Sequence, residues 1–222
     1  MKTKEKQYNP ILSLNEKEGL SKFGLMSHYC WMTDPTKTAF CMSRYKFVGK
    51  MLKNKNQVLE IGCADGFYSE IVDQHVKNLT ISDFDPIFIN NFKHIKKKNS
   101  KIKSIVFDIL KKPLKKKFDA IYCIDVLEHV NPKKEKLFFL NVKKMLNKNG
   151  VFICGIPSIE SQKYASKGSK EGHVNCKSGE DLRKTINRHF NNSFMFSMND
   201  EVVHTGFFPM AHYLWGIGCA KK

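Results

Sequence analysis

Residues 58–69, with the sequence VLEIGCADGFYS, constrain the fold of this chain more than any other stretch. Residues 58–61 form a short apolar run that suits a buried parallel strand, because such a strand is covered on both faces. Gly62 and Gly66 tolerate backbone angles that other residues avoid, and they let a ligand approach the main chain closely. A helix after Gly66 would present free backbone N–H groups to that ligand. The stretch predicts a strand, a binding turn and a helix, although an ordinary tight turn can carry the same glycines.

Acidic residues at the ends of the predicted strands favour a binding turn. Four further apolar runs predict strands at 79–82, 102–107, 118–124 and 151–155, and helices are predicted at 36–52, 67–76, 86–97 and 133–146. Strands that alternate with helices indicate a mainly parallel sheet with helices on both faces. Ligands bind outside the carboxyl ends of such strands, which is where Glu60, Asp83, Asp108 and Asp125 fall.

The two ends of the chain differ from this alternating pattern. Residues 1 to about 20 are polar and unpatterned, so we expect a loose arm there. Asp34 and Pro35 predict the start of the first core helix. The tail predicts a helix at 180–189 and two strands at 193–197 and 212–220. We therefore expect an N-terminal arm or lid, residues 1–35, followed by one domain, residues 36–222.

Length and composition limit the classes of protein that remain. A chain of 222 residues is enough for one α/β domain with a full core. No apolar run approaches the roughly 20 residues that span a bilayer, and no hydrophobic segment follows the polar N-terminus, so we expect neither a membrane span nor a signal peptide. The seven cysteines form no Cys-x-x-Cys pair, which favours reduced thiols in the cytoplasm over a structural zinc site.

The net charge of +17 invites comparison with nucleic-acid-binding proteins. The excess is almost entirely lysine, because arginine occurs only at positions 44, 183 and 188. Proteins that recognise nucleic acids usually depend on arginine and stacked aromatic rings. We therefore interpret the lysines as a solvated surface and expect no nucleic-acid partner, while an anionic nucleotide-linked substrate would also suit such a surface.

The segment from Glu60 to Gly66 resembles the first motif of class I S-adenosylmethionine-dependent methyltransferases, and the likeness extends from about Arg44 to the C-terminus. Ala64 departs from it, since many members have glycine there. The resemblance implies a Rossmann-like α/β fold: a doubly wound, mainly parallel seven-stranded sheet with an antiparallel last strand. It also implies S-adenosylmethionine as the methyl donor and S-adenosylhomocysteine as the product.

The resemblance assigns the donor-binding residues. It implies that Asp83, in preference to Asp85, accepts both ribose hydroxyls, and that Asp108 contacts the adenine amino group. Arg44 corresponds to the arginine that holds the donor carboxylate in ubiquinone-pathway O-methyltransferases. The complete expected set is Arg44, Glu60, Gly62, Ala64, Gly66, Asp83, Phe84, Asp108, Ile109 and Asp125. Asp108 as a strand-end cap and Arg44 as a surface helix residue remain alternatives.

Residues 124–130 resemble the Leu-Glu-His segment of ubiquinone-type O-methyltransferases and small-RNA 2′-O-methyltransferases. In those families an acid-x-x-Glu-His cluster with a distant histidine can hold a divalent cation. Here that set would be Asp125, Glu128, His129 and His173. We favour a metal-free site with a histidine as general base, in the order His173, His129, His204. Capping of the next helix or lining of the donor pocket is the further alternative.

Mixtures of aromatic and polar residues near both ends suit a sugar ring, and an aromatic-rich lid without ligand contacts is the alternative. The expected acceptor-binding residues are Trp31, Glu128, His173, His204 and His212. The whole chain also resembles methyltransferases found with bacterial surface-polysaccharide genes. We therefore expect an O-methyltransferase acting on a hydroxyl of a nucleotide-activated sugar for capsule or other surface polysaccharide, with a homodimer as one possible state. A phenol or quinone O-methyltransferase, and an RNA methyltransferase or nucleic-acid-binding protein, are the alternatives.

Overall fold

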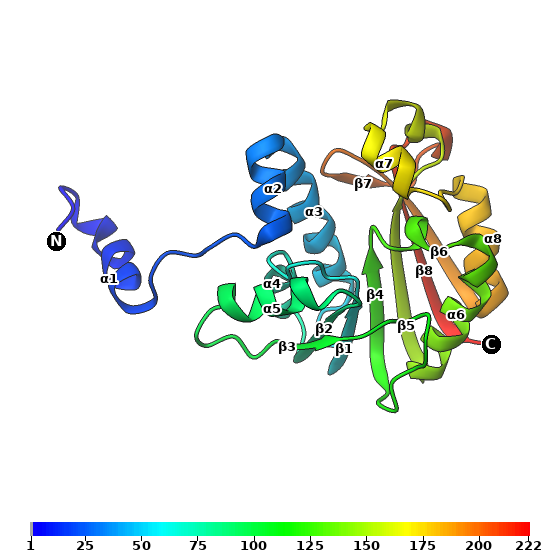
Figure 1. The fold of residues 1–222 in the computed structure, drawn as a ribbon, viewed down its shortest axis with the longest axis horizontal. Coiled ribbons are helices and arrows are strands. Elements are labelled where there is room, and N and C mark those ends of the chain that lie inside the picture. The colour runs from blue at the N-terminus through cyan, green and yellow to red at the C-terminus, as the bar shows by residue number, and fades with distance from the viewer. Residues whose placement is uncertain (1) are drawn as a thin grey trace.

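The computed structural model describes residues 2–222, and this part of the chain forms one sheet of eight strands with helices on both faces (Figure 1). The strand order is β3-β2-β1-β4-β5-β8-β6-β7. The strands are β1 (Gln57–Ile61), β2 (Asn78–Asp83), β3 (Lys103–Val106), β4 (Phe118–Ile124), β5 (Leu146–Pro157), β6 (Phe190–Asn199), β7 (Val202–His204) and β8 (Tyr213–Lys221). β1 to β5 pair in parallel, whereas β8 pairs antiparallel to β5 and β6. The predicted fold class is confirmed, and the short edge strand β7 is added to it.

The helices are α1 (Asn9–Glu18), α2 (Leu25–Thr33), α3 (Pro35–Met51), α4 (Ser69–Asp73), α5 (Pro86–Ile95), α6 (Glu135–Met145), α7 (Lys167–Gly172) and α8 (Gly179–His189). Five 3-10 turns occur within residues 2–222: η1 (Lys6–Tyr8), η2 (Leu127–His129), η3 (Pro132–Lys134), η4 (Glu160–Tyr164) and η5 (Phe208–Met210). Asp34 caps α3, as predicted, by accepting from the backbone N–H of Thr36 at 3.1 Å. No helix in this part of the chain is long and apolar enough to cross a membrane.

Two hydrophobic cores lie on opposite faces of the sheet. One contains Leu59 of β1 and Ile121 of β4 with buried residues of α6 and α8. The other contains their strand neighbours Val58 and Tyr122 with buried residues of α3, α4 and α5. The alternation follows from the two-residue repeat of a strand, which places successive side chains on opposite faces. Because helices cover both faces, the carboxyl edge of the parallel strands is left open for ligands.

The N-terminal segment differs from the sequence-based expectation. The expected loose arm contains helix α1, which has no buried residue and stands apart from the sheet in Figure 1; Met1 lies outside the described residues. Helix α2 was not predicted. Its N-terminal turn is anchored by Asp65, whose Oδ2 accepts from the backbone N–H of Ser27 at 2.7 Å and from its hydroxyl at 2.9 Å. Two residues 38 positions apart make this contact, so no local pattern indicates it.

Candidate active site

The turn between β1 and α4 has the backbone that its sequence predicts. Gly62 has φ +74° and Gly66 has φ +69°, a region that glycine occupies without penalty. A Cβ atom at Gly62 would lie 2.4 Å from Cγ2 of Val126, so no larger residue fits there without displacing that side chain. Ala64 has φ +47° and occupies the same region with a side chain. The turn therefore brings main-chain atoms close to the carboxyl edge of the sheet.

Glu60, near the end of β1, stabilises the strand that leads into this turn. Its carboxylate is fully buried and accepts three hydrogen bonds, from the hydroxyls of Tyr45 at 2.7 Å, Ser69 at 2.6 Å and Tyr122 at 2.7 Å. Burial raises its pKa, while the three hydroxyl donors oppose that rise. All of these bonds are made within the fold, so the carboxylate fixes the strand end against α3 and α4.

Asp83 ends β2 and faces the same turn. Its Oδ2 accepts from the backbone N–H of Ala64 at 2.9 Å, and its Oδ1 accepts from that of Asp85 at 3.0 Å. Burial raises the pKa of Asp83, and the backbone donors lower it. Asp85 instead caps α5, because its Oδ1 accepts from the backbone N–H of Ile87 at 2.9 Å. Asp83 thus faces the turn and Asp85 caps a helix, while the contact of Asp83 with the ribose stays a prediction.

The third strand-end acid makes the cap that the sequence left open. Asp108 is half-buried, and its Oδ1 accepts from the backbone N–H of Leu110 at 2.9 Å. Its neighbour Ile109 is buried in the core under α6. Phe84 is 73% exposed, so its ring is free to cover a flat group bound at this edge. The contact of Asp108 with adenine stays a prediction.

A cavity of about 500 Å³ opens beside the turn, a size typical of small-molecule sites. Helices α2 and α3, the turn, and the segment after β4 all contribute to its wall. Its polar lining includes Lys37, Cys41, Arg44, Tyr45, Asp65, Asp125, Glu128, His129, Ser169 and His173. Asp83 and Asp108 do not line it in the described chain.

Arg44 lies in the wall of this cavity, so the alternative of a surface helix residue is wrong. Its side chain is 14% exposed, and its Nη1 lies 2.8 Å from Oδ2 of Asp125. The guanidinium carbon lies 3.8 Å from the centre of the Tyr213 ring. Burial alone would lower the pKa of Arg44, but the charge of Asp125 raises it. Nε of Arg44 is buried and has no hydrogen-bond partner among residues 2–222.

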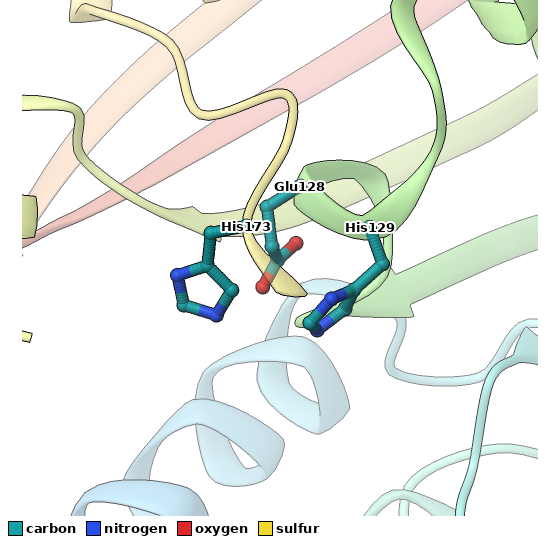
Figure 2. A group of neighbouring side chains, drawn as sticks. All are labelled: Glu128, His129 and His173. Carbon is teal, nitrogen blue, oxygen red and sulfur yellow. The ribbon is translucent and has the colours of Figure 1, made fainter. Parts of the chain in front are cut away.

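Glu128, His129 and His173 meet at the other side of the cavity. Each offers one ligand atom, and these atoms lie within 4.8 Å of one another (Figure 2). The two imidazole rings are 5.0 Å apart between centroids. Glu128 is fully buried, and in the described part of the chain neither of its carboxylate oxygens has a hydrogen-bond partner. Burial, and secondarily the charge of Asp125, raises the pKa of Glu128 well above its usual range.

Hydrogen bonds fix the tautomers of both histidines. Nδ1 of His129 lies 2.9 Å from the carbonyl oxygen of Gly172, and Nδ1 of His173 lies 2.7 Å from Oε1 of Gln162. The amide of Gln162 is oriented by its own Nε2, which donates to the carbonyl of Ser158 at 3.2 Å. In the neutral form of each ring, Nδ1 therefore donates and Nε2 keeps a lone pair. Burial, then the neighbouring His129, lowers the pKa of His173.

The Glu128 carboxylate and the Nε2 atoms of the two neutral rings thus face one another, and the carboxylate has no hydrogen-bond donor among residues 2–222. A buried carboxylate in this position is costly unless a positive species joins it. A proton on Glu128 or a divalent cation would satisfy the group, and the donor set of one carboxylate and two imidazoles fits either. Asp125, the fourth residue of the predicted cation set, is instead paired with Arg44.

Three predicted acceptor residues lie outside the cavity lining that residues 2–222 provide. Trp31 stacks on Phe23, with centroids 5.7 Å apart. Nδ1 of His204 accepts from the backbone N–H of Gly206 at 3.0 Å. Nε2 of His212 accepts from the backbone N–H of Asp200 at 3.1 Å. These are local contacts, and the cavity supplies no support for a role of these side chains in catalysis.

Sequence reasoning missed part of the wall that the structure provides. Lys37 and Cys41, which were not predicted, line the cavity from α3 together with the predicted Arg44. Their spacing of four and three residues places them on one helix face, a signal that was present in the sequence. Met26 and Cys30 line it from the unpredicted helix α2. Asp65 belongs to the predicted turn, but its contact with α2 could not be read from the motif.

Comparison with known proteins agrees with this geometry. Residues 59–154 match the family model described as "Methyltransferase domain". The chain is similar to a ubiquinone biosynthesis O-methyltransferase of Rickettsia akari (strain Hartford), with 25% identity over 165 residues. The match covers 69% of this chain and 65% of that protein, so the chain spans less than two thirds of the relative's length.

Solved structures show the same fold. The N-methyltransferase NodS from Bradyrhizobium japonicum WM9, in complex with S-adenosylhomocysteine, aligns with a TM-score of 0.64 and 20% identity, over 86% of this chain and 90% of that one. The DhpI–S-adenosylhomocysteine complex aligns with a TM-score of 0.65 and 13% identity, over 88% and 90% of the two chains.

The fold, the glycine turn under an acidic strand end and the match of residues 59–154 to the methyltransferase model together support a class I S-adenosylmethionine-dependent methyltransferase domain. The neighbours solved with S-adenosylhomocysteine support S-adenosylmethionine as the methyl donor of this domain.

Proposed function

We propose that this domain transfers a methyl group from S-adenosylmethionine to a hydroxyl oxygen, and that the hydroxyl is activated at Glu128, His129 and His173. The observation that carries this proposal is the convergence of three lone-pair groups in the cavity that also contains the binding turn. Methyl transfer is an in-line displacement in which positioning dominates. An aliphatic hydroxyl additionally has to lose its proton, whereas a carbon or nitrogen acceptor would need less help.

His173 is the first candidate for the base. Its Nδ1 donates to Gln162, so its Nε2 is the basic atom, and its lowered pKa keeps it neutral near pH 7. His129 has the same tautomer and is the second candidate. His204 remains the third, although it lies outside the described cavity lining.

A divalent cation is the competing activator at the same three residues. One carboxylate and two imidazoles with donating Nδ1 atoms are a common ligand set for transition metals. Held there, a cation would lower the pKa of a coordinated hydroxyl. The buried carboxylate of Glu128, which has no hydrogen-bond partner among the described residues, favours this hypothesis more strongly than the sequence motif does. A histidine base alone leaves that carboxylate without a partner unless the carboxylate is protonated.

For the acceptor we favour a nucleotide-activated sugar used for capsule or other surface polysaccharide. The net charge of +17 and Lys37 at the cavity support an anionic acceptor. The similarity to a ubiquinone biosynthesis O-methyltransferase supports a phenol or quinol as the second candidate. We place the reaction in the cytoplasm, since all seven cysteines are free thiols, as is usual in a reducing compartment.

Turnover of an acceptor panel with methyl-labelled S-adenosylmethionine tests the proposal. The panel contains nucleotide-sugars, a catechol, a quinol and a short RNA, each with and without EDTA. We expect label on a nucleotide-sugar oxygen. Label on the quinol or RNA would show that this compound, and not a nucleotide-sugar, is the acceptor. Transfer to nitrogen would refute hydroxyl activation. Activity that survives exhaustive EDTA treatment supports the histidine base, whereas loss restored by one added cation supports the cation.

A further inference from the structure

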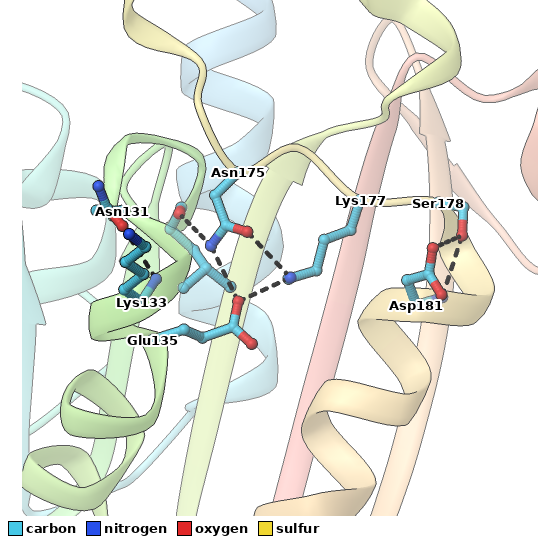
Figure 3. Close-up of polar contacts among 8 residues, drawn as sticks. Asn131, Lys133, Glu135, Asn175, Lys177, Ser178 and Asp181 are labelled. Carbon is cyan, nitrogen blue, oxygen red and sulfur yellow. Dashed lines mark hydrogen bonds and ion pairs between the residues drawn. The ribbon is translucent and has the colours of Figure 1, made fainter.

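Glu135, Asn175 and Lys177 form a polar cluster beside η2, which we call the clamp (Figure 3). Nζ of Lys177 lies 2.7 Å from Oε2 of Glu135, and Nδ2 of Asn175 donates to the same oxygen at 2.9 Å. Nζ of Lys177 also donates to Oδ1 of Asn175 at 3.2 Å. The side chains of Lys177 and Glu135 are only 12% and 14% exposed. Each member therefore contacts both others in a largely desolvated position.

The clamp joins two segments that are far apart in the sequence. Glu135 is the first residue of α6, whereas Asn175 and Lys177 lie between α7 and α8, in the segment that also contains His173. The Nδ2 of Asn175 additionally donates to the carbonyl of Leu127 in η2 at 3.3 Å. The side chains of the clamp thus connect the His173 segment to the segment from η2 to α6.

The backbone of the same segment is bonded to Glu128 itself. The N–H groups of Val174 and Asn175 both donate to the carbonyl oxygen of Glu128, at 2.8 and 2.9 Å. On the other side, the carbonyl of Lys177 accepts from the N–H of Ile159 just beyond β5 at 3.0 Å. The segment that starts one residue after His173 is therefore held between η2 and the end of β5.

The clamp is better suited to fixing geometry than to adding stability. A buried ion pair contributes little net free energy, because desolvation offsets its Coulomb attraction. No clamp residue belongs to the cavity lining found in residues 2–222, so none is placed to touch donor or acceptor. What the clamp determines is the distance between the two halves of the cluster, with Glu128 and His129 in η2 and His173 across from them.

We propose that Glu135, Asn175 and Lys177 are positioning residues that hold His173 in register with Glu128 and His129. This inference rests on the proposed role of these three residues in activating the hydroxyl. A displacement of about 1 Å at a reacting group can cost on the order of 100-fold in rate. Loss of a group that orients a metal-binding side chain typically lowers metal affinity or activity roughly 10- to 100-fold.

The test compares Asn175→Ala with Ser178→Ala. Asn175→Ala removes the side-chain bonds to Glu135, Leu127 and Lys177. Ser178→Ala removes a cap of α8, where Ser178 Oγ accepts from the N–H of Asp181 at 3.1 Å, and serves as a matched control three residues away. With the nucleotide-sugar that the panel identifies, Asn175→Ala should lower kcat roughly 10- to 100-fold with unchanged donor affinity. Ser178→Ala should leave kcat within about 2-fold, since a cap affects mainly stability.

A double-mutant cycle separates positioning from an independent role. In the His173→Ala background, Asn175→Ala should slow the reaction by less than about 3-fold, because the group that it positions is already absent. A full 10-fold further loss would overturn the inference. If none of His173→Ala, His129→Ala and His204→Ala slows the enzyme more than a few-fold, the proposed function fails. If His173→Ala alone has no effect, or if it slows the enzyme and Asn175→Ala does not, only the positioning role fails.

Amide hydrogen exchange supplies a readout that needs no acceptor. The N–H of Val174 should be protected in the native protein, exposed in Asn175→Ala and protected again in Ser178→Ala. Glu135→Gln, which keeps the shape of the side chain and its acceptor oxygen, should retain most of this protection. Full protection of Val174 in Asn175→Ala would show that the clamp does not hold the segment and would overturn the inference.

Discussion

The residues around the glycine turn, which we call the donor side, and the cluster of Glu128, His129 and His173, which we call the acceptor side, differ in how their carboxylates are satisfied. On the donor side, Glu60 accepts from three hydroxyls and Asp83 from two backbone N–H groups. Asp65 accepts from Ser27. On the acceptor side, both oxygens of Glu128 lack a partner among the described residues, and two imidazole lone pairs face them. On the donor side, the fold itself supplies hydrogen-bond donors to the three carboxylates. On the acceptor side, the carboxylate of Glu128 needs a proton, a cation or a ligand.

This difference predicts opposite consequences of mutation. A group that is satisfied by the fold contributes to stability, so its removal affects folding and binding together. A buried group without a partner costs free energy in the folded state, and such groups are retained where function needs them. Variants on the acceptor side should therefore lose rate without losing stability.

The largest expected effect is that of Glu128→Gln. The amide keeps the shape of the side chain but cannot take up a proton or bind a cation as a carboxylate does. We expect methyl transfer to fall by roughly 10²–10⁴, with donor affinity unchanged and thermal stability equal or higher. Steady-state kinetics, calorimetry and thermal unfolding on one preparation measure the three quantities. A clear loss of stability would show that the carboxylate of Glu128 makes stabilising contacts within the fold. The difference between the donor side and the acceptor side would then not hold.

Asp83→Ala should give the next largest effect, on donor affinity. It removes the two charge-assisted hydrogen bonds expected to the ribose and the bond to Ala64, so donor binding should weaken by about 2–4 kcal/mol. Asp85→Ala is the matched control, because it removes only the cap of α5 and should cost about 1 kcal/mol of stability. Calorimetry with S-adenosylhomocysteine measures both variants. Equal donor affinity in the two would refute the assignment of Asp83.

Arg44→Lys probes the boundary between the two sides. Lysine keeps the charge beside Asp125 but loses the fork and the stacking on Tyr213. We expect donor binding to weaken by about 1–2 kcal/mol, the range of one cation–π contact and one directed hydrogen bond. Normal donor affinity in this variant would mean that Arg44 serves only its pair with Asp125.

The distance in sequence between contacting residues explains which parts of the site the sequence could predict. The strands β1, β2 and β4 are apolar runs with acidic ends, and the glycine turn follows β1 directly in the chain, so local pattern was sufficient. Glu128 and His129 are adjacent and were found as one motif, and His173 came from the family resemblance. The Arg44–Asp125 pair joins residues 81 positions apart, and the Asn175–Glu135 bond joins residues 40 apart. Such pairs depend on packing, so no local pattern indicates them.

The missed elements have the same physical origin. Helix α2 buries only Ser27 and Cys30 and therefore shows no clear apolar stripe. The histidines at 204 and 212 were chosen for their chemistry, but each has a local backbone donor. Residue type indicated possible chemistry there, while strand pairing decided where the side chains lie.

Ala64→Gly, with the smallest expected effect, tests how far the donor side is complete before the donor binds. Alanine at φ +47° costs roughly 1–2 kcal/mol relative to an ordinary backbone conformation, whereas glycine adopts this φ freely. The added freedom of glycine in the unfolded chain offsets about 0.4–1 kcal/mol of that gain. We expect a net stabilisation of about 0.5–1 kcal/mol, seen as a higher urea midpoint at constant slope. Because Asp83 still accepts from the backbone N–H of residue 64, donor affinity should stay within about 2-fold, well inside the 1.4 kcal/mol that separates tenfold steps. A large gain in stability together with weaker donor binding would mean that the strained alanine holds the turn in its binding conformation, and the donor side would then also carry strain for function.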